Sequence, residues 1–426
     1  MAAARDTHYA SPLAEELAEP ALERFLRYVR IDTQSDPDSD SAPSTEKQFD
    51  LLRLLAEELR ALGLEPQVDE HGVVIATLPA TAERALPTLG FVAHVDTSPD
   101  VSGAGVDPHV HRSWDGSRID LGRGLALDAE ELPELADHVG HDIVSTDGTT
   151  LLGADDKAGV AEIMAAVAYL ADHPELEHGP IAVGFTPDEE VGRGTDHFDI
   201  ERFGAEAAFT VDGSTAGEVQ DETFSALEAV VRIRGVSMHP GYAKDQLVNA
   251  IKLAGRFLSR LPQDTLAPET TDEREGFVHP TRIEGDAGDV TLRFILRAFD
   301  EDELESHEAM LQRFADEVVA EEPRASLEVS SRRQYTNMKR KLDRHPQLLE
   351  AAREAVRRAG LEPRSALIRG GTDGSVLTEK GLPTPNLFTG GHAAHSEREW
   401  ICVQDIGAAA ATIVHLAQVW TEVRAG

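Results

Sequence analysis

The sequence predicts an α/β fold in which a mostly parallel sheet carries helices on both faces, with an inserted α+β domain. Up to Ala216, short apolar segments alternate with amphipathic ones, a pattern typical of parallel sheets covered on both sides. Between Phe224 and Ser331 the order becomes βαββαβ, the split arrangement of ferredoxin-like domains. The first pattern returns at Pro346. The predicted domains are a discontinuous first domain, residues 1–222 and 336–426, and an insertion, residues 223–335.

The elements of the first domain are predicted from apolar periodicity and from their end signals. Helical patterns cover Leu13–Ile31 and Thr45–Leu62, and Gly63 ends the second of them. The expected strands are Val73–Leu78, Leu86–Asp96, Pro180–Thr186, Ala207–Val211, Ala366–Arg369 and Pro385–Phe388. The expected later helices are Pro346–Ala359, Asp373–Lys380 and Val403–Val423.

The insertion is predicted to contain four strands and two helices. Its central strand pair is joined by the turn sequence Gly285-Asp286-Ala287-Gly288. The expected strands are Phe224–Gly235, Gly276–Glu284, Asp289–Phe299 and Ala325–Ser331, and the expected helices are Asp245–Leu261 and Glu301–Glu321.

The composition is ordinary for a globular protein except for an excess of acidic side chains. Of 426 residues, 41% are hydrophobic and 27% are charged, and the formal net charge is −37. Because such a field repels a phosphate backbone and an anionic membrane surface, we expect neither nucleic acid nor membrane as a partner. Cys402 is the single cysteine, and Met1–Glu19 lacks a positively charged start followed by an apolar run. These features predict a cytoplasmic protein.

Two adjacent acids, Asp155 and Asp156, follow Gly153 where a loop becomes a helix. Apolar residues then recur at helical spacing between Val160 and Val167. A helix N-terminus favours negative charge, so this segment taken alone also fits a plain capped helix.

Further acids and a histidine stand at the ends of predicted strands. His94 and Asp96 are two residues apart, so they point the same way and the carboxylate can orient the imidazole. Glu189 and Glu190 follow another strand, where neighbouring acids repel one another unless a cation offsets them. Asp212 ends a third strand. Because ligands bind beyond the carboxyl ends of parallel strands, we expect these side chains to converge in one crevice.

The long polar segment Pro99–Thr146 contains several histidines. We expect part of it to form strands beside the Asp155 loop. Its histidines are predicted to be surface residues rather than metal ligands, namely His109, His111, His138 and His141.

The combination of histidine and carboxylate side chains suits zinc, cobalt or manganese. A pair of metal ions needs a bridging carboxylate, and Asp155 is the candidate. A hydrolase also needs a base beside the attacking water, and Glu189 with Glu190 offers one base and one ligand.

Eight short motifs, in one order along nearly the whole chain, resemble those of the di-zinc aminoacylase and carboxypeptidase-G-like metallopeptidases. Within that family the chain is most similar to the branch of cytosolic aminotripeptidases. The motifs are His94–Asp100, Leu151–Gly159, Thr186–Glu190, Val211–Gly213, His239–Gly241, Val248–Ala250, Arg369–Gly374 and Pro385–Gly391.

The resemblance implies two divalent metal ions per chain, with Zn²⁺ as the expected ion. One ion would be held by His94, Asp155 and Asp212, and the other by Asp155, Glu190 and His395. Asp155 would bridge the two ions, and its peptide bond to Asp156 is expected to be cis.

The resemblance also implies roles outside the metal ligands. Asp96 would orient His94, and Glu189 would take a proton from the attacking water and pass it to the leaving amine. The insertion would act as a lid and allow a homodimer to form through it. The residues expected to contact substrate from the insertion are His239, Asn249 and Arg297, with Arg293 and Arg232 as alternatives to Arg297.

The implied activity is that of a tripeptide aminopeptidase, which removes the N-terminal residue from tripeptides by two-metal hydrolysis. The alternatives on the same scaffold are a dipeptidase, a carboxypeptidase and an N-acyl amino-acid amidohydrolase. A two-metal phosphoesterase is less favoured because the chain is acidic. A non-catalytic metal-binding protein is less favoured because Glu189 is present.

The chain departs from the family pattern after Gly391. Where Tyr-Asn-Tyr-His is expected, this chain has His392-Ala393-Ala394-His395. His395 matches the metal ligand by position. His392 replaces an aromatic residue that can stack on substrate, and it leaves a second imidazole as an alternative ligand.

Overall fold

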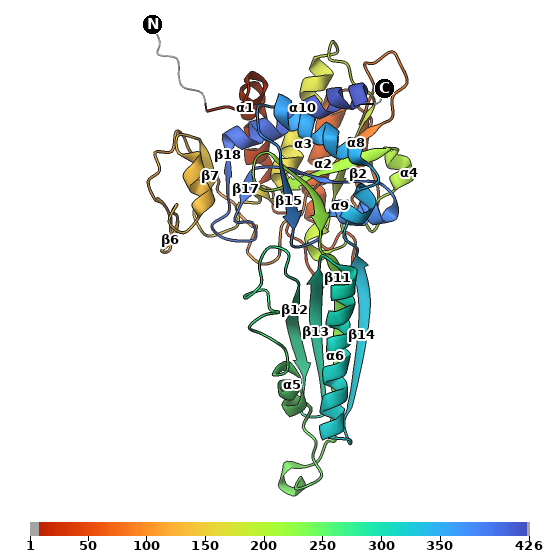
Figure 1. The fold of residues 1–426 in the computed structure, drawn as a ribbon. Helices are drawn as coiled ribbons and strands as arrows, with labels where there is room; N and C mark the ends of the chain where they lie inside the picture. Colours follow the sequence, from red (N-terminus) through yellow and green to blue (C-terminus); the bar gives the residue numbers. More distant parts are fainter. Residues whose placement is uncertain (1–7, 424–426) are drawn as a thin grey trace. The chain divides into compact units, whose positions relative to one another are not determined.

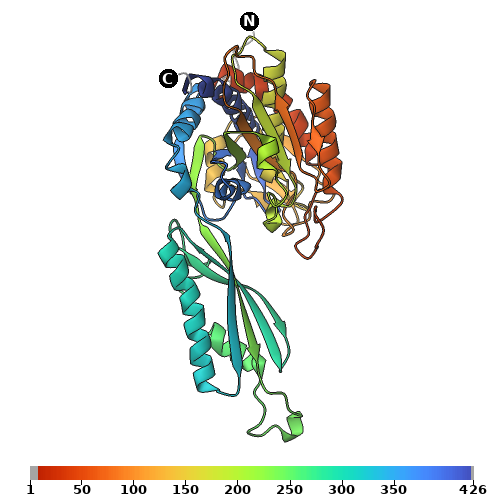
Figure 2. The ribbon, with the colours of Figure 1, turned by 90° about the vertical axis from the view of Figure 1, so that its right-hand side faces the viewer.

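The computed structural model describes residues 8–423, which form two compact units (Figures 1 and 2). The first unit comprises residues 8–221, Lys341–Ala366 and residues 372–423. The second comprises Glu222–Arg340 and Leu367–Gly371. Each unit has its own sheet and its own apolar core.

The first unit is built on an eight-stranded sheet with the order β1-β2-β8-β3-β9-β16-β10-β15. The central strands β8, β3, β9 and β16 are parallel, whereas β1, β2 and β10 run antiparallel to their neighbours. This confirms the predicted α/β class with a mostly parallel sheet. The strands are β1 (Gln67–Val68), β2 (Val74–Leu78), β3 (Leu89–His94), β8 (Ile181–Thr186), β9 (Ala207–Gly213), β10 (Glu218–Thr223), β15 (Arg364–Ile368) and β16 (Asn386–Phe388).

Every residue of β3 and β8 is buried, as expected for central strands covered on both faces. On one face, Phe203 of α4 and Leu377 of α9 pack against Val92 and Ala208. The helix α3 contacts β3 and β9 and is in turn packed against α1 and α10. None of the helices in residues 8–423 combines the length and the hydropathy that a membrane span requires. The helices are α1 (Pro12–Tyr28), α2 (Gln48–Ala61), α3 (Ala154–Asp172), α4 (Ile200–Phe203), α7 (Lys339–Leu342), α8 (Pro346–Arg358), α9 (Asp373–Lys380) and α10 (Val403–Val423).

The start of α3 is irregular and tightly packed. Gly153 has a φ of +80°, and Asp155 and Asp156 have non-helical dihedral angles within the first turn. A Cβ atom at Gly159 would lie 1.8 Å from the carbonyl oxygen of Val211 in β9, so only glycine allows the helix this approach. The close contact fixes the first turn of α3 beside the end of β9.

The polar segment between β3 and α3 forms short strands and a 3₁₀ helix, η1 (Pro133–His138). Its strands are β4 (His109–His111), β5 (Ile119–Gly122), β6 (Leu125–Leu127) and β7 (Ile143–Ser145). Strands β4 and β7 join β17 (Gly391–His392) and β18 (Trp400–Cys402) in a second sheet of the order β17-β18-β7-β4. This sheet places the segment beside the loop that carries His395.

The prediction that the histidines of this segment are surface residues is wrong for His138. Its side chain is buried, and its Nε2 lies 2.9 Å from Oδ2 of Asp405 in α10. A buried carboxylate compensates the cost of burying an imidazole, and this partner lies far away in the sequence. His109 is exposed, and His111 and His141 are half-buried.

The second unit has the predicted element order βαββαβ, and its four strands form an antiparallel sheet of the order β12-β13-β11-β14. The helix α6 lies along the strands (Figures 1 and 2) and shares one apolar core with α5, through side chains such as Phe257 and Leu311. The elements are β11 (Ser225–Arg234), the 3₁₀ helix η3 (Pro240–Tyr242), α5 (Ala250–Leu258), β12 (Phe277–Gly285), β13 (Asp289–Ala298), α6 (Glu301–Glu321) and β14 (Ser326–Tyr335).

Several elements differ from the prediction, and two of these differences have a clear physical reason. The helix expected from Asp245 begins at Ala250, because the Asn249 side chain accepts a hydrogen bond from the backbone N–H of Lys252 and caps the helix. The strand β10 was not predicted, since its sequence Glu-Val-Gln-Asp-Glu-Thr has no run of apolar residues. It is formed by pairing with β16.

Candidate active site

Seven side chains predicted from the sequence come together in the first unit, at the carboxyl ends of the parallel strands. His94 is the last residue of β3, and Asp212 lies near the end of β9. Glu189 and Glu190 form a 3₁₀ turn directly after β8. The remaining members of this cluster are Asp96, Asp155 and His395, and their contacts are given below. The predicted convergence of strand ends thus agrees with the geometry.

Asp155 lies at the centre of the cluster. Its Oδ1 is 3.0 Å from Nε2 of His94, and its Oδ2 is 3.2 Å from Nε2 of His395. The peptide bond between Asp155 and Asp156 is cis. The two oxygens of one carboxylate therefore face two imidazoles, one from the end of β3 and one from the loop after β17.

Each imidazole faces a further carboxylate. Oδ1 of Asp212 is 3.7 Å from Nε2 of His94, and Oε2 of Glu190 is 2.9 Å from Nε2 of His395. This gives two half-sites that share Asp155. Oε2 of Glu189 lies 3.9 Å from Nε2 of His94, the same nitrogen that faces Asp155 and Asp212.

Asp96 is fully buried, and its carboxylate contacts three other residues of the cluster, namely His94, Glu189 and Glu190. Its Oδ1 lies 3.3 Å from Nδ1 of His94, on the side of the ring away from Asp155. Its two oxygens also accept the backbone N–H groups of Glu189 and Glu190, at 3.0 and 3.2 Å. One carboxylate thus orients an imidazole and fixes the turn that presents both glutamates.

Glu399, which was not predicted as a site residue, holds the loop that carries Asp155. Its buried carboxylate accepts the backbone N–H groups of Leu152, Gly153 and Asp155, at 2.7, 2.6 and 3.0 Å. Three donors on one carboxylate fix the position of this loop. The only signal in the sequence was an acid four residues after His395.

Asp373 was quoted within a motif but was not predicted as a site residue. It is buried at the start of α9, and it accepts a hydrogen bond of 2.6 Å from Oγ1 of Thr186, the last residue of β8. Burial raises the pKa of Asp373 to about 7. Through its hydrogen bond with Thr186, Asp373 supports the end of β8 just before the turn that carries Glu189.

Burial raises the pKa of three carboxyl groups of the cluster, whereas the pKa of Asp155 is lowered, because hydrogen bonds from His395 and His94 outweigh its burial. Burial raises the pKa of Glu190 to about 8 and that of Asp212 to about 6, and it raises the pKa of Glu189 well above its ordinary value. Although burial lowers the pKa of His395, its hydrogen bonds to Asp155 and Glu190 raise it to about 11. So many acids in one buried site need positive charge to ionise together.

The donor set fits divalent metal ions. Ligand atoms of His94, Asp155 and Glu190 lie within 4.8 Å of one another, as do those of His94, Asp156 and Asp212. Among the described residues, Oε1 of Glu190 is buried and has no hydrogen-bond partner. Imidazole nitrogens with carboxylate oxygens are donors typical of zinc and related ions. A divalent ion would also compensate the mutual repulsion of the acids.

Residues 144–419 match the model of the peptidase family M20/M25/M40. The chain belongs to this peptidase family. Among curated relatives, Peptidase T of Geobacillus thermodenitrificans is 46% identical over 406 residues, which cover 94% of this chain and 98% of the relative. M20-family membership therefore rests on the family model and on a relative that matches nearly the whole chain, including sequence before residue 144.

Solved structures agree with this family fold. The aminopeptidase PepT of Bacillus cereus superposes with a TM-score of 0.72 at 24% identity, and 95% of this chain and 99% of that chain are covered. A tripeptidase of Staphylococcus aureus gives a TM-score of 0.74 at 23% identity with the same coverage. Both comparisons confirm the overall fold of an M20-family peptidase.

The three residues predicted to contact substrate lie on the second unit of this M20-family chain. His239 is exposed beside η3, and its Nδ1 accepts the backbone N–H of Gly241 at 3.1 Å. Asn249 caps α5. Arg297, on β13, is half-buried, and its guanidinium carbon lies 5.6 Å from the ring centre of Tyr335.

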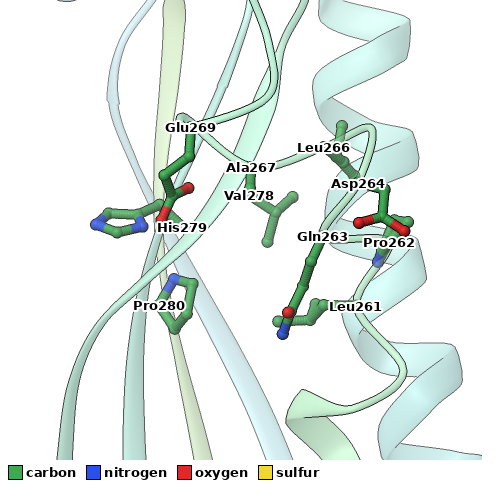
Figure 3. Close-up of a pocket in the computed structure, with 10 residues that line it drawn as sticks. All are labelled: Leu261, Pro262, Gln263, Asp264, Leu266, Ala267, Glu269, Val278, His279 and Pro280. Atoms are coloured by element: carbon green, nitrogen blue, oxygen red, sulfur yellow. The ribbon is translucent and has the colours of Figure 1, made fainter.

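The second unit also contains a cavity of about 460 Å³ between β12 and the loop after α5 (Figure 3). Apolar side chains such as Leu266 and Val278 line it together with Asp264 and Glu269, and Figure 3 shows them on the loop and the strand. His239, Asn249 and Arg297 do not line it. This cavity therefore adds nothing to the predicted substrate contacts.

His392, which stands where an aromatic residue was expected, does not face Asp155. Its ring stacks on Trp400, with ring centres 4.3 Å apart and an angle of 17° between the planes. It belongs to a second group of possible ligands, with His138 and Asp405. His395 is the imidazole of this loop that reaches the cluster around Asp155.

Proposed function

We propose that this chain is a tripeptide aminopeptidase that releases the N-terminal residue with the help of two divalent metal ions. The observation that carries the proposal is the position of Asp155, whose two oxygens face His94 and His395. A shared carboxylate between two imidazole-carboxylate half-sites is the arrangement that a two-metal hydrolase needs.

The residues that would hold the two ions follow from the half-sites. His94 and Asp212 would complete one site and Glu190 and His395 the other, with Asp155 shared and Zn²⁺ as the proposed ion. When bound, such ions act as Lewis acids toward the peptide carbonyl and the attacking water. Asp96 would orient His94 through Nδ1, leaving Nε2 free to bind.

Glu189 is the proposed general base. Its backbone is fixed by Asp96, and its carboxylate lies beside His94 without being one of the proposed ligands. Because burial raises its pKa, Glu189 holds a proton more readily than an ordinary glutamate. It can therefore accept a proton from the attacking water and deliver it to the leaving amine.

Recognition of both peptide ends would account for a preference for tripeptides. The free amine is favoured near the dense acids of the cluster, and the far carboxylate needs a cation, for which Arg297 is the candidate. His239 and Asn249 are the other proposed substrate contacts. The compared proteins are named Peptidase T, an aminopeptidase and a tripeptidase. These names support cleavage at the N-terminus and a preference for substrates of three residues.

The remaining parts of the proposal concern the insertion and the cell. The insertion, proposed as residues 223–335, would close over the substrate as a lid and allow a homodimer. The single cysteine, Cys402, is buried, which is consistent with a protein of the reducing cytoplasm.

Replacing Arg297 with alanine is expected to raise the KM for tripeptides by ~10-fold or more, since a charged hydrogen bond contributes about 1.5–3 kcal/mol. Steady-state kinetics on free tripeptides and on tripeptide amides measures this directly. The wild type should hydrolyse the amides poorly, and the variant should hydrolyse them no worse than the wild type does.

Arg293→Ala is the matched control, because Arg293 lies on the same strand but is exposed and pairs with Glu228 at 3.5 Å. It should leave the KM for tripeptides unchanged. Equal cleavage of amides and free acids by the wild type would refute recognition of the carboxylate. If Arg293→Ala raises the KM for tripeptides and Arg297→Ala does not, Arg297 is not the residue that binds the substrate carboxylate.

A further inference from the structure

A second group of possible metal ligands lies buried in the first unit, formed by His138, His392 and Asp405. They come from three separate elements: His138 ends η1, His392 ends β17, and Asp405 lies in the first turn of α10. Their relative exposures are 8%, 7% and 7%. One ligand atom of each lies within 4.8 Å of those of the other two. None of the three belongs to the cluster around Asp155.

His138 is held in the way that metal-binding histidines usually are. Its Nδ1 lies 2.9 Å from the backbone carbonyl oxygen of Glu134, and its Nε2 lies 2.9 Å from Oδ2 of Asp405. A carbonyl that accepts the Nδ1 proton leaves Nε2 as the ligand atom, directed at the carboxylate.

His392 supplies the observation that points to a missing partner. Among the described residues, its Nε2 is buried and has no hydrogen-bond partner. Its ring is fixed by stacking on Trp400, and burial lowers the pKa of His392 to about 4, so the ring is neutral. A neutral imidazole with an unused buried nitrogen is the form that binds a metal ion, and leaving that atom unpaired costs free energy.

The surrounding chain brings these groups close together. Gly390 has a φ of +91°, and a Cβ atom there would lie 2.4 Å from Cβ of Asp405, so the backbone before His392 can approach α10 only with glycine. Ligand atoms of His141 and Cys402 also lie within 4.8 Å of one another and of a nitrogen of His138. This neighbouring group shares His138 with the first one.

We propose that His138, His392 and Asp405 bind a divalent ion of the zinc class, at a structural site separate from the cluster around Asp155. Two imidazole nitrogens and a carboxylate oxygen are ligands typical of such an ion. The ion ties β17 to η1 and α10, and β17 ends three residues before His395. The site thereby fixes the loop that carries His395.

Zinc stoichiometry of the full-length chain tests this site. The protein is stripped with a chelator, equilibrated with Zn²⁺ by dialysis, and its zinc content is measured by elemental analysis. His392→Phe keeps a ring to stack on Trp400 but removes both nitrogens, and His109→Phe makes the same change at an exposed histidine. We expect His392→Phe to bind one zinc ion fewer than the wild type, and His109→Phe to bind as many as the wild type.

The comparison with the wild type needs no particular ion count at the cluster around Asp155, so failure of the proposed function does not by itself overturn this site. Equal zinc content in wild type and His392→Phe overturns the site. Should His392→Phe fail to fold, anomalous scattering at the zinc edge from wild-type crystals soaked in Zn²⁺ decides. A peak among His138, His392 and Asp405 supports the site, and its absence while these side chains are ordered refutes it.

Discussion

The variant Glu189→Gln is expected to lower kcat for tripeptides by at least ~100-fold, the scale of a general-base contribution. Glutamine keeps the shape of the side chain, but it cannot take a proton from the attacking water. The backbone N–H of residue 189 still donates to Asp96, so the turn that presents Glu190 should stay in place. Metal content measured on the same sample should therefore equal that of the wild type.

Glu201→Gln is the matched control, because it makes the same chemical change on an exposed glutamate of α4. Its kcat should not change. Near-normal turnover by fully metal-loaded Glu189→Gln would assign the base elsewhere. A fall in kcat that is accompanied by loss of metal would show that Glu189 is a ligand instead.

The variant Asp155→Ala is expected to lose two metal ions relative to the wild type and nearly all activity. Both imidazoles of the cluster face this one carboxylate, at 3.0 and 3.2 Å, so its removal affects both half-sites together. Loss of a partner that only supports a ligand already costs ~10–100-fold in metal affinity, and a shared ligand should cost more. Elemental analysis after dialysis, together with tripeptide hydrolysis, measures both effects.

Asp147→Ala, an exposed change in the loop before α3, is the control and should keep the wild-type metal content. An Asp155→Ala protein that loses a single ion would argue against a bridge. One that retains both ions would place the metal ligands outside this cluster.

Side chains that follow predicted strands could be found from the sequence. His94, Glu189 and Asp212 follow or end apolar runs, and parallel strands bring their carboxyl ends to one edge. Asp155 could be predicted because the loop before α3 has its own turn signals. His395 was identified by resemblance, since its loop has no regular pattern.

Residues whose partners lie far away in the sequence could not be predicted. Glu399 binds the N–H of Asp155, 244 positions earlier, and no periodicity marks such a contact. His138 was expected on the surface because its segment is polar, but its partner Asp405 lies 267 positions away. In both cases the tertiary fold, rather than local sequence, determines burial and charge.

The product formed first from a tripeptide of three different residues tests the central claim most directly. Chromatography of an early time course with metal-loaded protein should show the free N-terminal residue and an intact C-terminal dipeptide, and chelation should abolish both. N-acylated tripeptides and free dipeptides should be cleaved far more slowly. A free C-terminal residue as the first product, or dipeptides and acylated peptides cleaved as fast as the tripeptide, would contradict tripeptide aminopeptidase activity.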